Sequence, residues 1–156
     1  MALTFTPVNS IMMSIRFVFL FSLLPFLISA QRVYQNSEGA IKGYDPVAYF
    51  TDKKPVKGKK QFTYRWQDAT WYFASQAHLD LFKASPEKYA PQFGGFCAYG
   101  VSRNYKVKIE PEAWTILDDK LYLNYDLDVS KTWNKDPAGY IKKANANWAK
   151  LKDEKE

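Results

Sequence analysis

The stretch "TWYFASQAHLDLFKASPEKYAPQFGG", Thr70 to Gly95, changes its pattern at Ser75. The aromatic residues before Ser75 suit a strand, whereas Ser75 itself is a favoured N-cap for a helix that runs to about Ala84. Ser85-Pro86-Glu87 then places a cap, a proline ring and an acid where a further short helical turn prefers them. The stretch therefore predicts a strand that leads directly into a capped helix.

The segments on both sides of this stretch predict antiparallel hairpins. Upstream, "FTYRW" and "TWYF" read as two strands around a tight turn at Asp68-Ala69, with aromatic residues alternating on one face of the first strand. Downstream, "WTILDDKLYLNY" reads as a second hairpin that bends at Asp118-Asp119. We expect the two hairpins to form short sheets.

The last helix is predicted to start at Asp136-Pro137. On it, four apolar residues share one face: Ile141, Ala144, Trp148 and Leu151. Together these segments predict an α+β fold, a small single domain of short antiparallel strands with peripheral helices.

The start of the chain has the pattern of a secretory signal peptide. In "MSIRFVFLFSLLPFLISAQ", one Arg precedes a short apolar run, and small residues precede Gln31. We expect cleavage after Ala30 and a periplasmic or secreted protein without stable membrane insertion, an uncleaved anchor being the alternative. The expected organisation is a signal peptide at 1–30, a polar lead-in at 31–42, a domain at 43–151 and a charged tail at 152–156.

The charge pattern and the missing motifs exclude several function classes. The chain has 22 Lys and Arg against 16 Asp and Glu, but the basic residues are spread along it, which is typical of a solvated surface and not of a nucleic-acid site. No phosphate-binding glycine loop and no nucleophile-elbow sequence occur. We therefore expect no nucleic-acid partner and no organic cofactor.

His78 is the only histidine and Cys97 the only cysteine. Cys97 has no partner for an internal disulfide, so its thiol is either buried or used. His78 would be the third residue of the helix capped by Ser75, where the helix dipole favours a neutral ring. Either the two residues meet in one site, or each is simply packed in the core.

Two parts of the sequence resemble the YHS domain. They are "YDPVAYF" and "TWYFASQAHLDLFKASPEKYAPQFGG", against the family pattern Asp-Pro-Val-Cys, Phe-Cys-Ser-x-x-Cys-x-x-x-Phe and Pro-x-x-Tyr. Further segments, "GGFCAYGVSRN", "PEAWTILDDKLYLNY" and "ANANWAKL", resemble exported bacterial YHS domain-containing proteins. The resemblance covers about Gly43 to Leu151 and implies a YHS/TRASH-like core with a C-terminal extension.

The resemblance also implies heavy-metal binding, although the cysteine pattern has changed. The three family cysteines correspond here to Ala48, Ala74 and His78. Imidazole is a competent ligand for copper or zinc, and Cys97 lies within the longer exported pattern.

We therefore expect a non-enzymatic metal-binding protein that uses Cys97 and His78. Copper as Cu(I) is preferred to Zn(II), for which Asp45 and Asp80 are further candidate ligands, and a metal-handling protein is a possible partner. One alternative is a thiol redox protein or sensor that uses Cys97. Another is a metal-free scaffold domain that binds a ligand or partner through aromatics exposed around Tyr44, Tyr49, Trp66 and Trp71, although alternation makes these more typical of a core.

Overall fold

Two antiparallel hairpins form the main sheets of the computed structural model, which describes residues 2–3 and 32–154. The first pairs β3, Lys59–Trp66, with β4, Ala69–Phe73, and the second pairs β5, Glu110–Leu117, with β6, Lys120–Asn124. Both hairpins were predicted, and each strand pair contains a register irregularity near its open end. The predicted signal peptide falls almost entirely outside the described residues.

The hairpin bends are tight because both central residues of each have positive φ. Asp118 and Asp119 have φ of 50° and 56°, as a two-residue hairpin turn requires, which confirms the predicted bend. In the first hairpin the bend lies at Gln67 and Asp68, with φ of 49° and 57°, one residue earlier than predicted. Ala69 instead begins β4, because its side chain is buried in the core.

Side-chain caps start two of the predicted helices, whereas Ser85, predicted as a cap for the short turn that follows the first of them, forms no side-chain cap hydrogen bond. Ser75 Oγ accepts a hydrogen bond from the N–H of His78 at 3.2 Å and starts α2, Gln76–Ala84, which is followed by α3, Pro86–Tyr89. The Asp136 carboxylate accepts from the N–H of Gly139 at 3.0 Å and starts α6, Pro137–Leu151. Both caps confirm the sequence prediction.

Several short elements were not predicted. They are three helices, α1 (Ala48–Thr51), α4 (Ala98–Ser102) and α5 (Leu127–Trp133), the 3-10 turns η1 (Ile41–Gly43) and η2 (Gln92–Gly95), and the strand pair β1 (Gln35–Asn36) and β2 (Gly39–Ala40). Most span only one or two turns and carry little periodic signal. Residues 32–42, expected as a lead-in, form β1, β2 and the start of η1 and bury Val33, Ala40 and Ile41.

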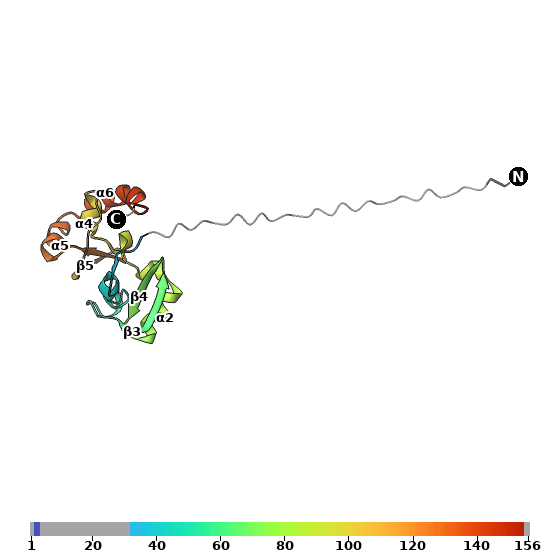
Figure 1. The fold of residues 1–156 in the computed structure, drawn as a ribbon. Helices are drawn as coiled ribbons and strands as arrows, with labels where there is room; N and C mark the ends of the chain where they lie inside the picture. The colour runs from blue at the N-terminus through green and yellow to red at the C-terminus, as the bar shows by residue number, and fades with distance from the viewer. Residues whose placement is uncertain (1, 4–31, 155–156) are drawn as a thin grey trace.

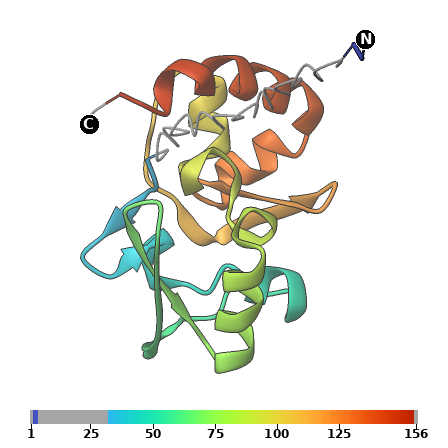
Figure 2. The same cartoon turned by 90° about the vertical axis from the view of Figure 1, so that its right-hand side faces the viewer.

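The elements gather into two groups, each around its own apolar cluster. In Figures 1 and 2, β3, β4 and α2 lie together at one end, and α4, α5 and α6 at the other. The first cluster contains Tyr49, Trp71 and Phe82, and the second contains Phe93 and Trp133. The expected α+β fold, a small single domain with short antiparallel strand pairs, is confirmed.

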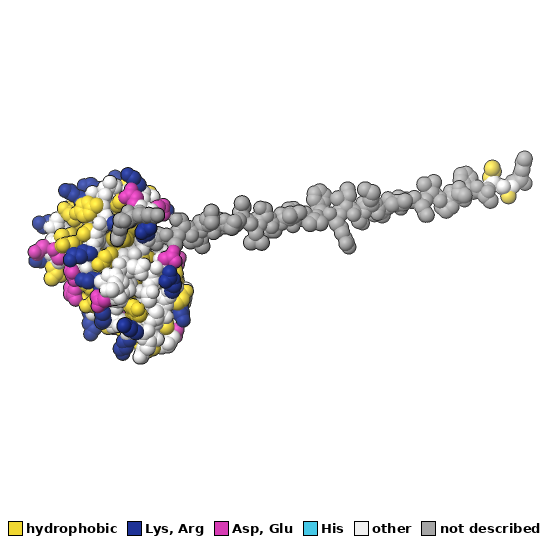
Figure 3. All heavy atoms as spheres, viewed as in Figure 1, with side chains coloured by type: hydrophobic (Ala, Val, Ile, Leu, Met, Phe, Trp, Pro, Cys, Tyr) yellow, Lys and Arg dark blue, Asp and Glu magenta, His cyan; other side chains and the backbone are white. Residues whose placement is uncertain are grey.

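The aromatics considered for the scaffold hypothesis lie mostly in the core. Tyr49 and Trp71 are buried, while Tyr44 and Trp66 are half-buried and pack against the same cluster. On the face shown in Figure 3, Lys and Arg side chains are scattered among acids without forming one continuous patch. No described helix is long and apolar enough to cross a membrane.

Candidate functional site

A buried carboxylate, that of Asp45, joins the start of α1 to the start of α2. Its Oδ1 accepts hydrogen bonds from the N–H groups of Val47 at 2.8 Å and Ala48 at 3.3 Å. Its Oδ2 accepts from the N–H of Ala74 at 2.8 Å and lies 2.6 Å from His78 Nδ1. Asp45 is fully buried, and a buried carboxylate is costly unless such donors surround it. Asp45 therefore links the chain before α1 to the histidine.

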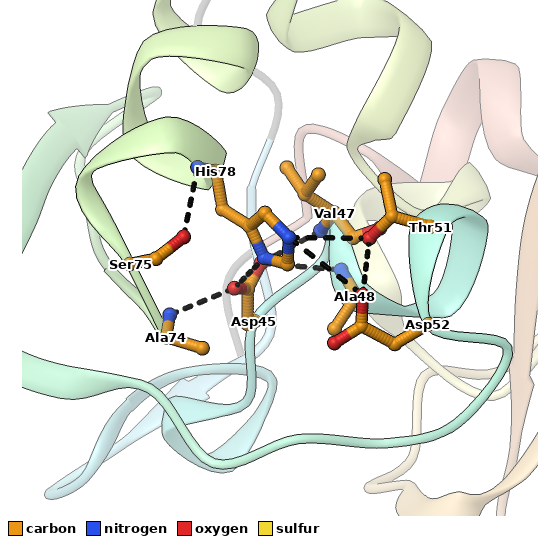
Figure 4. A network of polar contacts seen from close by, with 8 residues as sticks. All are labelled: Asp45, Val47, Ala48, Thr51, Asp52, Ala74, Ser75 and His78. Carbon is orange, nitrogen blue, oxygen red and sulfur yellow. Dashed lines mark hydrogen bonds and ion pairs between the residues drawn. The ribbon is translucent and has the colours of Figure 1, made fainter.

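Both the backbone and the ring of His78 are held by hydrogen bonds. The Ser75 cap places it in the first turn of α2, and Asp45 then holds Nδ1 (Figure 4). Because the carboxylate already accepts from three backbone N–H groups, it acts as an acceptor toward the ring as well, so Nδ1 carries the hydrogen. In the neutral form of the ring, this tautomer leaves the lone pair on Nε2, on the opposite side of the ring.

Two side chains at the end of α1 face that lone pair. His78 Nε2 lies 3.2 Å from Thr51 Oγ1 and 3.7 Å from Asp52 Oδ1 (Figure 4). The Thr51 hydroxyl has one hydrogen, and its shortest contact is to Asp52 Oδ1 at 2.8 Å. The His78 side chain is 14% exposed and that of Asp52 is 36% exposed, so the group lies at the protein surface and not in the core.

Cys97 lies in a different environment. It is 1% exposed and caps α4, where Sγ accepts from the N–H of Gly100 at 3.4 Å and contacts Asn124 Oδ1 at 3.7 Å. Burial raises the pKa of the thiol, and the N–H of Gly100 only partly opposes this. Among the described residues no hydrogen bond joins Cys97 to His78, and each side chain has other polar partners.

The remaining candidate, Asp80, is exposed on α2 and accepts a hydrogen bond from Gln76 Nε2 at 2.8 Å. Of the four candidate metal ligands, the structure thus brings Asp45 and His78 together. Cys97 and Asp80 have other polar partners.

The donor set limits the kind of metal site that these residues fit. Within residues 2–3 and 32–154, no group of three or more His, Cys, Asp or Glu side chains is placed to hold a metal ion. A closed four-ligand site of the structural zinc type therefore does not fit. What fits is a partial site made of an imidazole nitrogen, His78 Nε2, and a carboxylate, that of Asp52, beside a hydroxyl.

Thr51 and Asp52 were missed by the sequence analysis, although one signal was present. Asp45-Pro46 has the same aspartate-proline start as Asp136-Pro137, which correctly predicted α6. A short helix after Asp45 would have placed residues 51 and 52 at its end. That this end faces His78 depends on tertiary packing and has no local signal.

A comparison with known protein families finds a match, and it covers the region of the candidate site. Residues 47–93 match the model of the YHS domain family, a range that includes Thr51, Asp52 and His78 and ends before Cys97. No curated protein and no solved structure matches the chain. Residues 47–93 of this chain are therefore similar to the YHS domain family.

Proposed function

We propose that the protein binds a metal ion at an open site, with His78 Nε2 and the Asp52 carboxylate as its two ligands. The observation that carries this proposal is the 2.6 Å contact between the buried Asp45 carboxylate and His78 Nδ1. In metal sites, a ligating histidine usually donates its other N–H to a carboxylate, which fixes the tautomer and makes the ligand more basic. Asp45 thus has the role of an orienting residue and not of a ligand.

Copper is the preferred metal, as Cu(II). A site of imidazole and carboxylate is a nitrogen and oxygen site, for which affinity among divalent metals is highest with Cu(II) and lower with Zn(II). The Cu(I) alternative with Cys97 needs a thiolate, whereas burial raises the pKa of this thiol. Two protein ligands leave the other positions to water or to a partner.

The open site and the leader-like start of the chain favour metal handling outside the cytoplasm. A metal held by two side chains and solvent is easily transferred to a protein with more ligands. We therefore propose a metal-handling partner in the periplasm or outside the cell, and no catalysis. The thiol-redox alternative draws no support from a thiol that is 1% exposed.

The test is a calorimetric titration of the full chain, without an affinity tag, with Cu(II) and separately with Zn(II). The informative variants are His78→Ala, Asp52→Asn and Cys97→Ala. Asp80→Asn is the matched control, because it also neutralises a carboxylate within residues 47–93 but one that contacts Gln76.

We expect one Cu(II) per chain, bound more tightly than Zn(II). His78→Ala should abolish this binding and Asp52→Asn should weaken it about tenfold, whereas Asp80→Asn and Cys97→Ala should leave it unchanged. Absence of binding, or binding that is lost only in Cys97→Ala, would overturn the proposal.

A further inference from the structure

A second site is a cleft of about 310 Å³ between the two groups of elements. One wall comes from Trp66 at the end of β3, from Gln67 in the turn that follows, and from Glu87 on α3. The other comes from Phe93 in η2 and from Asn145 and Trp148 on α6. The cleft therefore lies where the two apolar clusters meet, and its volume is that of a small-ligand pocket.

Aromatic rings supply much of the cleft lining. The rings of Phe93 and Trp148, which both line the cleft, have centroids 6.0 Å apart and meet at 71°, in an edge-to-face arrangement. Trp66 is half-buried and packs on Phe82, at 5.6 Å between centroids, behind the cleft. This packing fixes the position of the Trp66 ring and so keeps the wall in place without a ligand.

Gln67 adds an acceptor with no partner of its own. Its side-chain oxygen, Oε1, is buried and accepts no hydrogen bond from any described residue. A buried carbonyl without a donor has lost its hydrogen bonds to water without replacing them, so a donor at this position would bind favourably. The tight turn, in which Gln67 has φ of 49°, holds the residue at the cleft.

The charge of the cleft has one sign. Glu87 is the only ionisable side chain among the residues that line it, and it forms no ion pair with any described residue. The lining includes no Lys or Arg, so an anion would have no counter-charge there.

We propose that this cleft binds a small organic cation that carries N–H groups, either a primary ammonium or a guanidinium. Such a group satisfies the three features together: it is attracted to the faces of Trp and Phe rings, it donates to Gln67 Oε1, and it is a counter-ion for Glu87. Its source is either a free amine or a Lys or Arg side chain of a peptide. This site is separate from the metal site at His78 and does not depend on it.

The test follows the indole N–H signals of Trp66 and Trp148 by NMR, in the full chain labelled with ¹⁵N. The probes are n-butylguanidinium and n-butylammonium, with n-butanol as the neutral control and tetramethylammonium as a cation without N–H groups. We expect saturable shifts of both indoles with the first two probes, at a dissociation constant of about 1 mM, as befits ligands of this size.

Glu87→Gln and Gln67→Asn test the two polar contacts. Gln67→Asn retracts the acceptor while keeping a residue that tolerates positive φ. Each should weaken binding about fivefold, while Asp119→Asn, which removes an exposed carboxylate at the other hairpin, should not. An arginine-containing peptide that binds more tightly than n-butylguanidinium would identify a peptide as the source, and equal affinity a free cation; both results support the site.

Three results would overturn the proposal. They are indole signals that do not move, shifts that n-butanol reproduces, and a loss of affinity in Asp119→Asn equal to that in Glu87→Gln. The last would mean that the cations respond only to the overall charge of the protein.

Discussion

The Asp45 carboxylate lies 2.6 Å from His78 Nδ1, across 33 residues of sequence. The same carboxylate accepts hydrogen bonds from three backbone N–H groups, two at the start of α1 and one just before α2. One buried acid therefore holds two helices together and fixes the orientation of the only histidine in the chain. Any function of His78 depends on this arrangement.

We predict that Asp45→Asn destabilises the chain by about 3 kcal/mol, because an amide cannot accept from all four donors and places its own NH₂ against one of them. Urea unfolding followed by circular dichroism measures this change. Asp52→Asn, at the exposed side of the ring, should change the free energy of unfolding by less than about 0.5 kcal/mol. Equal effects of the two substitutions would mean that Asp45 is not the organising residue.

The Cys97 thiol should react slowly in the folded chain. It is 1% exposed and its pKa is raised by burial, whereas a reactive cysteine is exposed and readily ionised. We expect an aromatic disulfide reagent at pH 7.5 to label Cys97 far more slowly in the native chain than in urea. Rapid labelling of the native chain would revive the hypothesis of a thiol sensor.

Stability should fall as the pH rises above the ordinary pKa of a thiol, about 8.5. The raised pKa of Cys97 means that the folded chain keeps a proton that the unfolded chain releases, so alkaline pH favours unfolding. Tyr49 and Tyr122, whose pKa values are also raised by burial, should extend this loss above about pH 10.

Thermal unfolding between pH 7 and 11 tests this dependence, with Cys97→Ala as the comparison. The variant should be less stable at pH 7 but should lose less stability between pH 8 and 10. Parallel curves for the two proteins would show that the thiol makes no contribution.

Gly94 should not tolerate a side chain. Its φ is +61°, and an added Cβ would lie 2.1 Å from the carbonyl oxygen of Arg32. Gly94 O also accepts the N–H of Tyr34 at 2.8 Å, so the two chain segments run in direct contact. Gly94→Ala should cost about 3 kcal/mol in unfolding free energy through backbone strain and the clash. Ala146→Gly, on the exposed side of α6, should cost about 1 kcal/mol; similar losses would contradict the close approach.

The sequence predicted those parts of the fold whose signals are local. Ser75 and Asp136 start helices through their own side chains, and Asp118-Asp119 bends a hairpin through its own backbone. Such features are fixed by residues next to one another in the chain.

The candidate site was harder to predict because its contacts are tertiary. His78 was identified from its rarity and its place after Ser75, but its actual partner is Asp45 and not Cys97. Nothing local distinguishes these two pairings, since both bridge separate elements. Asp52 was missed for the same reason, since its proximity to Nε2 requires that α1 and α2 be packed first.

The most direct test of the account is the NMR spectrum of the untagged full chain labelled only with ¹⁵N-histidine, recorded with and without Zn(II) as a diamagnetic substitute for Cu(II). A single histidine gives one pair of ring nitrogen signals. We predict that Nδ1 keeps its hydrogen, bonded to Asp45, while the Nε2 signal shifts as Zn(II) is added, and that Asp52→Asn reduces this shift. A metal-dependent shift at Nδ1, or no change at either nitrogen, would contradict metal binding through Nε2 of a histidine held by Asp45.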